Sequence, residues 1–469
     1  MRSRRSVPVD WRLRGHRVSR RRRRPQPAGP FQTEITALAN DGRGIGRVPE
    51  ADVGADPGKV IFIDGALPGE TVEFMRVRNR SDFAEGRLEA VVTPAPDRVE
   101  PPCRHAGYCG GCKLQHLASA GQLREKQQQV LDALARIGKV EPATLAEPLT
   151  GPTLGYRRRA RLSVRDVPAK GRVLVGFRER DKPYVADIDA CEVIVPELGH
   201  RLMELSDALG RLSIRGEIPQ VEIAYGDACA ALTIRCLAQP TAADREELEA
   251  LEGRLGVQVY LQPGGLDSIA PLNPPARSLS YQLPEDDITL VFEPQDFIQV
   301  NGAVNRLLVQ RALEALDLRP GDRVLELFAG LGNFTLPMAR RGAQVHAVEG
   351  DAALVARADA NARLNGVDAQ ISTEVANLFE TSEPWRWSGQ QFDLALLDPP
   401  RAGAAECLDA LVATGVRRVV YVSCHPATLA RDVGRLVHVH GFRCEQAGVI
   451  DMFPQTAHVE SMAVLTRGD

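Results

Sequence analysis

A cysteine follows a short run of β-branched and aromatic residues in the C-terminal part of the chain. Residues 420–423 (VYVS) have the composition of a buried strand, and Cys424 comes directly after them, two residues before Pro426. A lone cysteine is most often a small apolar core residue. A thiol that ends a strand at a ligand site can instead act as a nucleophile, so the neighbouring motifs must decide between the two.

A glycine-containing turn predicts the ligand site. In residues 326–335 (ELFAGLGNFT), Gly330 and Gly332 stand where a strand turns into a helix, which lets a ligand approach the backbone closely. Thr335 occupies the place of the third glycine that a dinucleotide needs, which argues against NAD. Glu349 ends the next strand, where its carboxylate can accept both hydroxyl protons of a ribose. An adenosine without a pyrophosphate indicates S-adenosylmethionine.

A carboxylate held by prolines follows a later strand. Residues 398–403 (DPPRAG) begin where strand 392–397 ends, at the edge of the sheet where open α/β folds bind ligands. The two prolines stiffen the loop and fix Asp398 beside the expected methyl donor. Cys424 ends the next strand at the same edge, and we therefore interpret its thiol as a nucleophile.

Such a thiol suits methylation of a uracil at C5. This carbon becomes nucleophilic after a thiolate adds to C6, and a base must then remove the C5 proton before the thiolate leaves. Glu460, in the strand-like run 459–465, is the candidate base, although a glutamate at a strand end can also be merely solvated. His425 is a weaker candidate because adjacent residues of an extended chain point to opposite sides.

The elements that position these residues lie in residues 301–469, where helical and strand-like segments alternate, beginning with a helix at 303–316. Strands separated by helical lengths predict a parallel, doubly wound sheet, which an antiparallel pair completes. The expected strands are residues 323–327, 344–348, 392–397, 418–423, 442–449 and 459–465.

Three segments precede this one. Residues 1–30 are expected to form a basic, disordered tail, since the first 24 residues hold eleven arginines and one aspartate; it could contact RNA phosphates or be a transit peptide. Residues 31–97 show short β-like runs between glycine-rich turns, which predict an OB-type barrel that binds nucleic acid. Residues 98–300 predict a mixed α+β domain.

A basic stripe is expected in the third of these segments. If residues 156–165 (YRRRARLSVR) are extended, Arg157, Arg159 and Arg161 share one face and apolar residues the other. Like charges in line repel each other unless a polyanion lies across them, which favours contact with RNA. A solvated edge strand would show the same pattern.

The same segment carries a group of cysteines. Cys103, Cys109, Cys112 and Cys191 offer four thiolates, which suit zinc or an iron–sulfur cluster. Zinc ribbons usually pair two CxxC motifs, and only one is present here, which favours a cluster over zinc and over four unrelated thiols.

The overall composition limits the location of the protein. No apolar run reaches the roughly 18 residues of a membrane span. Nine scattered cysteines without a secretory signal predict reduced thiols. We expect a cytoplasmic monomer without membrane contact.

Four motifs resemble those of the RNA uracil-C5 methyltransferases, and most closely those of the branch that makes 5-methyluridine in 23S ribosomal RNA. The resemblance extends over nearly the whole chain from residue 31 onward. It implies a class I, Rossmann-like S-adenosylmethionine-dependent domain behind an OB-type TRAM domain. The motifs are residues 328–334 (FAGLGNF), 398–403 (DPPRAG), 422–432 (VSCHPATLARD) and 451–462 (DMFPQTAHVESM).

The resemblance also implies roles for individual residues. Cys424 would be the nucleophile, Glu460 the base, and Phe297 a stacking partner for a uracil flipped out of the RNA. A [4Fe-4S] cluster would occupy the four cysteines. One departure is His425, where asparagine is expected. The implied contacts to S-adenosylmethionine are Gln299, Phe328, Asn333, Glu349, Asn377 and Asp398.

The sequence is also compatible with other functions. The target could be the T-loop uridine of tRNA or a cytosine, although the tRNA enzymes of the family lack the barrel and the cysteine group. The chain could also be a non-catalytic RNA-binding assembly factor with a relic pocket, which would not bind S-adenosylmethionine.

Overall fold

The computed structural model describes residues 28–468 except residues 53, 181, 382 and 383. Residues 1–27 of the expected tail lie outside the described residues. The last three residues expected in the tail, 28–30, belong to the first strand, so the barrel domain begins earlier than residue 31. The chain packs as two compact units. The first contains the described residues up to Ala37 together with Gly44–Thr93, and the second contains Leu38–Arg43 and Pro94–Asp469.

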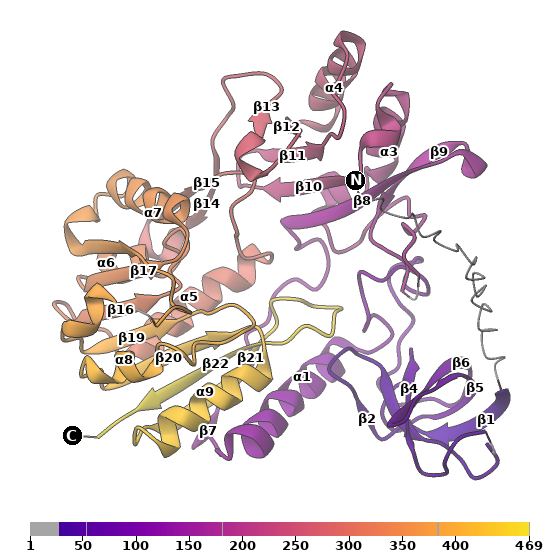
Figure 1. Cartoon of the computed structure of the whole chain (residues 1–469), viewed down its shortest axis with the longest axis horizontal. Helices are drawn as coiled ribbons and strands as arrows, with labels where there is room; N and C mark the ends of the chain where they lie inside the picture. The colour runs from indigo at the N-terminus through magenta and orange to yellow at the C-terminus, as the bar shows by residue number, and fades with distance from the viewer. Residues whose placement is uncertain (1–27, 53, 181, 382–383, 469) are drawn as a thin grey trace, which may run out of the picture. The chain divides into compact units, whose positions relative to one another are not determined.

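The first unit is a six-stranded sheet in the order β1-β5-β6-β4-β3-β2 (Figure 1). Its fully buried apolar core includes Ile35, Ile61 and Phe74. The short strand β3 was not expected because it lies within a glycine-rich stretch. The strands are β1 Ala28–Glu34, β2 Ala37–Leu38, β3 Gly44–Arg47, β4 Val60–Asp64, β5 Thr71–Asn79 and β6 Phe83–Thr93.

The second unit begins with a six-stranded sheet in the order β13-β12-β11-β10-β8-β9, followed by the hairpin β14-β15. Helix α3 packs on β9 and α4 on β12. The strands are β8 Arg159–Val167, β9 Arg172–Gly176, β10 Gln220–Tyr225, β11 Ala230–Arg235, β12 Gln258–Gln262, β13 Ala270–Pro271, β14 Leu279–Leu283 and β15 Ile288–Phe292. The helices are α1 Ser119–Ala133, α2 Pro196–Gly199, α3 Leu202–Arg211 and α4 Ala242–Leu255.

An eight-stranded sheet in the order β18-β17-β16-β19-β20-β22-β21-β7 completes the second unit. Strands β16 to β20 are parallel, and β22 lies antiparallel between β20 and β21. The strands are β7 Thr144–Leu145, β16 Arg323–Leu327, β17 Gln344–Glu349, β18 Ile371–Val375, β19 Leu394–Leu397, β20 Arg418–Ser423, β21 Arg443–Ile450 and β22 Glu460–Thr466. The helices are α5 Gly302–Leu316, α6 Thr335–Arg340, α7 Ala352–Leu364, α8 Leu408–Ala413 and α9 Pro426–His438.

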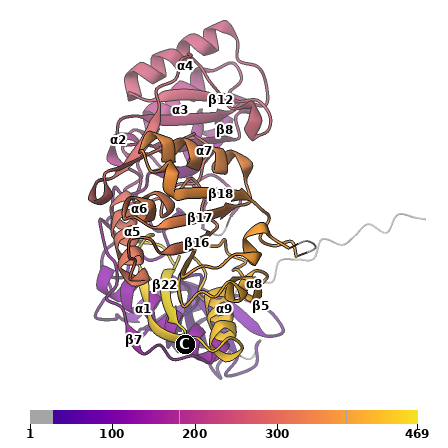
Figure 2. The same ribbon diagram turned by 90° about the vertical axis from the view of Figure 1, so that its left-hand side faces the viewer.

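Helices cover both faces of this sheet (Figure 2). Successive residues of a strand point to opposite faces. Val324 and Leu396 therefore pack with residues of α5, α6 and α7, whereas Leu325 and Tyr421 pack with residues of α8 and α9. Each fully buried leucine contributes about 1.5–3 kcal/mol to the free energy of folding. The sheet is therefore stable and holds the loops at its ends in fixed positions.

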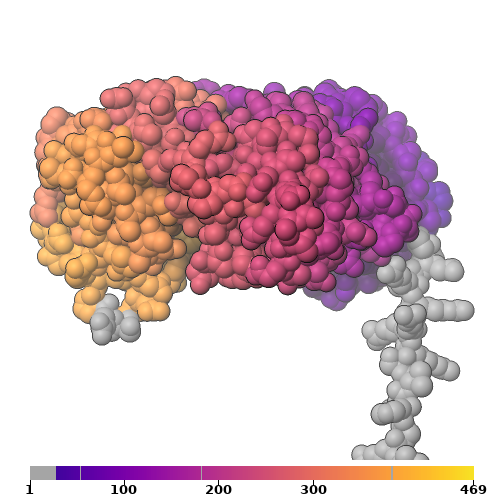
Figure 3. Space-filling view, turned by 90° about the horizontal axis from the view of Figure 1, so that it is seen from above, coloured from indigo at the N-terminus to yellow at the C-terminus, as the bar shows by residue number. Residues whose placement is uncertain are grey.

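On the surface of the second unit, the central segment and the C-terminal segment adjoin each other (Figure 3). Among the described helices, none is both long and apolar enough to cross a lipid bilayer.

Candidate active site

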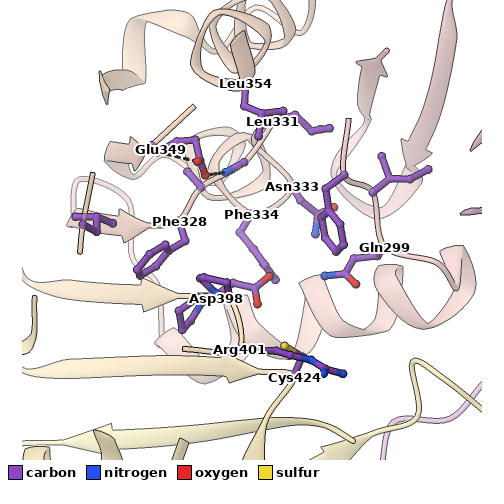
Figure 4. Close-up of a pocket in the computed structure, with 18 of the residues that line it drawn as sticks. Gln299, Phe328, Leu331, Asn333, Phe334, Glu349, Leu354, Asp398, Arg401 and Cys424 are labelled. Atoms are coloured by element: carbon purple, nitrogen blue, oxygen red, sulfur yellow. Dashed lines mark hydrogen bonds between the residues drawn. The ribbon is translucent and has the colours of Figure 1, made fainter. Parts of the chain in front are cut away.

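One pocket of about 520 Å³ opens at the C-terminal ends of the parallel strands (Figure 4). Four side chains that had no role from the sequence also line it: Tyr281, Arg401, Phe453 and His458. The structure thus brings together residues from eight separate stretches of the chain between Tyr281 and Glu460. The sequence-predicted residues that line the pocket are Phe297, Gln299, Phe328, Asn333, Glu349, Asn377, Asp398, Cys424 and Glu460.

The turn after β16 forms one wall of the pocket. Phe328, Gly330 and Gly332 have φ angles of 65°, 58° and 100°. A positive φ raises the conformational free energy of a phenylalanine, and it persists only where the surrounding structure imposes it. Residues in such conformations are common at ligand sites. At Gly332 a Cβ atom would lie 2.3 Å from Leu336 Cδ1. The turn therefore requires glycine here and presents backbone to the pocket.

The carboxylate of Glu349, at the end of β17, is fixed against this turn. It accepts hydrogen bonds from the backbone N–H groups of Gly330 at 3.0 Å and of Gly350 at 2.7 Å. Figure 4 shows it across the pocket from Asp398 and Cys424. The Asp351 N–H group donates to it as well, at 3.1 Å. A carboxylate has about four acceptor positions, so about one remains for a ligand's hydroxyl group.

The Asn333 side chain is held by two residues that the sequence did not indicate. Asn333 and Asn305 exchange two amide hydrogen bonds of 2.9 Å, and the Tyr281 hydroxyl donates to Asn333 Oδ1 at 2.9 Å. Most of the hydrogen-bonding capacity of this amide is thereby used within the protein. Tyr281 and Asn305 lie far from the motif in sequence, and no local pattern could have revealed them.

Cys424 lies between the end of β20 and the start of α9. The pKa of its thiol is raised to about 11, chiefly by burial and also by the nearby charges of Glu460 and Asp398, while Arg401 opposes them. The adjacent His425 caps α9, because its Nδ1 accepts from Thr428 N at 3.4 Å. The imidazole of His425 is therefore directed to the helix start.

Glu460 is a buried acid, and Asp398 is half-buried. Burial raises the pKa of each, and for Glu460 the charge of Asp398 adds to the effect. In the same pocket, burial and the nearby Arg401 cation lower the pKa of His458 to about 4, so this imidazole is neutral at pH 7. Arg401 donates to His458 Nδ1 at 3.1 Å.

The predicted basic stripe is partly neutralised. Arg161 faces Glu222 of β10 in the strand register, and both Arg159 and Arg161 form ion pairs with its carboxylate at 3.4 and 2.9 Å. Repulsion between the arginines therefore does not by itself require a polyanion. The Arg159 side chain is largely buried and donates to the carbonyl of Pro294, whereas Arg161 is exposed.

Arg157 lies in an isolated bridge before β8 instead of in the strand. Its guanidinium lies 5.8 Å from the centre of the Phe453 ring, which lines the pocket. The first arginine of the expected stripe thus packs against the wall of the candidate active site.

The four cysteines of the central segment line one small cavity of their own: Cys103, Cys109, Cys112 and Cys191. Burial raises the pKa of Cys112 to about 12 and that of Cys191 to about 11, and neighbouring thiols contribute to both shifts. Within the described residues, no three His, Cys, Asp or Glu side chains are grouped tightly enough for a single metal ion.

The sheet order, the glycine turn after β16 and the acidic strand ends together define a Rossmann-like fold of the S-adenosylmethionine-dependent methyltransferases. A solved structure shares this fold: that of Pyrococcus abyssi tRNA (uracil-54, C5)-methyltransferase in complex with S-adenosyl-L-homocysteine. It matches with a TM-score of 0.70 and 24% identity over 93% of this chain and 100% of that chain. The expected fold class is confirmed.

The chain belongs to the RNA uracil-C5 methyltransferase family and carries a TRAM domain. The tRNA (Uracil-5-)-methyltransferase family matches residues 278–468, and the TRAM domain matches residues 33–75. The 23S rRNA (uracil(1939)-C(5))-methyltransferase RlmD of Alkalilimnicola ehrlichii is 49% identical over 95% of this chain and 99% of its own length. The RlmD of Methylococcus capsulatus is 47% identical over 97% of this chain and 100% of its own length. The resemblance seen in the motifs is thus confirmed.

Proposed function

We propose that this chain transfers a methyl group from S-adenosylmethionine to C5 of a uridine in 23S ribosomal RNA. One observation carries the proposal: a thiol, Cys424, and a buried carboxyl, Glu460, line the same pocket as the glycine turn and the Glu349 carboxylate. The names of the relatives support a ribosomal substrate at uracil 1939, and the TRAM domain supports RNA binding. Such a substrate agrees with a cytoplasmic location.

In the first half of the reaction, Cys424 Sγ forms a bond to C6 of the uracil, and the electrons of the C5–C6 double bond make C5 nucleophilic. S-adenosylmethionine supplies the methyl group as an electrophilic sulfonium and leaves as a neutral thioether. The Cys424 thiol must first lose its proton, because burial holds its pKa at about 11. Asp398 accepts this proton, so that Glu460 stays available as the base of the second half, and the Arg401 cation stabilises the thiolate that forms.

In the second half, Glu460 removes the proton from C5. The released electrons restore the C5–C6 double bond and expel Cys424 as a thiolate. Burial raises the pKa of Glu460, which makes its ionised form a stronger base than an ordinary glutamate. His458, whose pKa is lowered to about 4, is a weaker base than Glu460 and does not replace it in this step.

Phe297 is placed to receive the target base. Its side chain lines the pocket and is 65% exposed, which is costly for a phenylalanine unless a partner covers it. A uracil inside folded RNA must be flipped out to reach a thiol, and an aromatic ring can stack on the extruded base. The exposed Arg161 is suited to a phosphate contact, and Arg157 supports the wall formed by Phe453.

For the cysteine cavity we propose a [4Fe-4S] cluster. Four thiols line one cavity, and neighbouring thiols help to raise the pKa of Cys112 and Cys191, which favours a positively charged group among them. A four-iron cluster binds each of its thiolates at a different iron, so four thiols around one cavity suit it. Such a cluster would hold residues 103–112 against residue 191. Iron and sulfide analysis of the purified protein, with Cys112→Ser beside it, tests this; iron at zero in the unaltered protein contradicts it.

The function is tested with a 23S RNA fragment and labelled S-adenosylmethionine. Cys424→Ala should abolish 5-methyluridine formation while it leaves binding of S-adenosylmethionine within about threefold, and Cys444→Ala, which removes another buried thiol, should remain active. Glu460→Gln should accumulate a covalent protein–RNA adduct. Full activity of Cys424→Ala would refute the mechanism, and methylation of tRNA in place of the 23S fragment would refute the substrate.

A further inference from the structure

The base-bearing end of β22 is reached through a nine-residue loop, residues 451–459. Ile450, the last residue of β21, pairs with Glu460, the first residue of β22. The loop between them contributes Phe453 and His458 to the pocket wall, and their rings are 4.5 Å apart. The path of this loop therefore sets both the wall of the pocket and the position at which β22 begins.

One face of α1 holds the loop through two buried polar side chains. Lys126 Nζ donates to Asp451 Oδ1 at 2.7 Å and to the carbonyl of Phe453 at 3.0 Å. One turn earlier, Gln122 exchanges two hydrogen bonds with Gln455: its Nε2 donates to Gln455 Oε1 at 3.0 Å, and its Oε1 accepts from Gln455 N at 2.9 Å. Gln122 and Lys126 are 2% and 1% exposed.

Neighbouring groups complete this attachment. The backbone N–H groups of Lys113 and Leu114 both donate to the carbonyl of Gln455 at 3.0 Å. The Tyr156 hydroxyl donates to the carbonyl of Pro454 at 2.9 Å. Gln455 has a φ of 68°, a conformation that costs a residue other than glycine about 1 kcal/mol or more and persists only where its surroundings impose it. The loop is thus held in one conformation from outside the sheet.

The buried ion pair of Lys126 and Asp451 is not explained by stability alone. An apolar pair of the same volume is often as stable as a buried ion pair or more so, because both charges lose their hydration. Burial lowers the pKa of Lys126, and the Asp451 charge opposes this. What the pair supplies is a defined geometry for the first residues of the loop.

We propose that Gln122 and Lys126 are positioning residues for the proton-abstraction step. They hold the loop so that Glu460 lies at the required place beside the methylated C5, while Cys424 and the cofactor-binding turn lie on other elements. This inference rests on the proposed role of Glu460. It predicts that loss of either contact slows removal of the C5 proton much more than it slows addition of the thiol.

RNA that carries 5-fluorouridine at the target separates these steps. Thiol addition and methyl transfer proceed, but fluorine at C5 leaves no proton to remove, so the covalent adduct stays on the protein. The rate of adduct formation therefore reports the first half of the reaction, and turnover on ordinary uridine reports both halves. Lys126→Met is compared with Gln128→Met, an exposed position on the same helix.

We expect Lys126→Met to bind S-adenosylmethionine and to form the fluorouridine adduct within about threefold of the unaltered protein, with turnover on uridine reduced at least tenfold. Lys126→Arg should restore part of the turnover, and Gln128→Met should change nothing. Gln122→Met, which leaves no buried charge unpaired, provides the same test if Lys126→Met does not fold. Unchanged turnover, or a parallel loss of binding, adduct and turnover, would overturn the inference. If the unaltered protein forms no adduct, the proposed function itself fails.

Discussion

The carboxyl groups of Asp398 and Glu460 line one pocket from the end of β19 and the start of β22, and the charge of Asp398 raises the pKa of Glu460. Glu326, inside β16, is a third acid whose pKa burial raises to about 8, with smaller contributions from Asp398 and Glu349. Near pH 7 Asp398, whose pKa is raised to about 7, and Glu326 are therefore partly protonated. The proposed methyl donor carries a positively charged sulfonium, which favours their ionised forms.

This arrangement predicts that S-adenosylmethionine binds more tightly as the pH rises from 6 to 8. A carboxyl with a raised pKa is neutral below that pKa and ionised above it, and only the ionised form attracts the cation. Calorimetry at pH 6, 7 and 8 should show affinity increasing at least threefold and protons released on binding. Glu326→Gln should weaken this dependence. Constant affinity across the range would contradict the electrostatic assignment.

Gly332→Ala should reduce affinity for S-adenosylmethionine more than tenfold. The φ of 100° is strained for alanine, and the new Cβ would lie 2.3 Å from Leu336 Cδ1, so the turn or the Leu336 side chain must shift. Gly366→Ala is the matched control, because Gly366 has a φ of 65° with open space around it and lies away from the pocket. The two variants are compared by calorimetry, and equal affinities would show that the turn does not bind the cofactor.

Glu349→Gln should weaken binding of S-adenosylmethionine by about tenfold or more. The carboxylate accepts backbone hydrogen bonds with both oxygens, from Gly330 and Gly350. A glutamine must point its NH₂ group at one of these N–H donors, which leaves a polar group unsatisfied and turns the side chain. Equilibrium dialysis with labelled cofactor measures the effect, and unchanged affinity would remove Glu349 from the ligand contacts.

Tyr421→Phe should lower the free energy of unfolding by about 1.5–3 kcal/mol. The Tyr421 hydroxyl donates at 2.6 Å to Asp432, whose fully buried carboxylate also accepts from Ala404 N at 2.8 Å. Without the hydroxyl, a buried carboxylate loses a strong donor. Chemical denaturation of this variant is compared with that of Tyr184→Phe, where the ring is exposed. If the free energies of unfolding of the two variants differ by less than about 0.5 kcal/mol, the Tyr421 hydroxyl is not needed to stabilise the Asp432 carboxylate.

Much of the C-terminal sheet followed from local patterns in the sequence. Strands β16 and β20 begin and end at the expected residues, because buried parallel strands are continuous apolar runs with clear ends. Strand β18 was missed: Ile371–Val375 lies at the edge of the sheet, and its one buried residue is the polar Glu374, so it lacks that pattern.

By itself the sequence determined which chemical groups end the parallel strands, since a glycine turn, two acids and a cysteine at successive strand ends meet at one edge of any doubly wound sheet. Only the tertiary structure decided which distant residues hold those groups. Glu222 pairs with Arg159 and Arg161 of the stripe. Asn305 and Tyr281 form hydrogen bonds with Asn333, and Lys126 pairs with Asp451. Such contacts join segments tens to hundreds of residues apart, and their geometry arises when sheets and helices pack, which no local periodicity records.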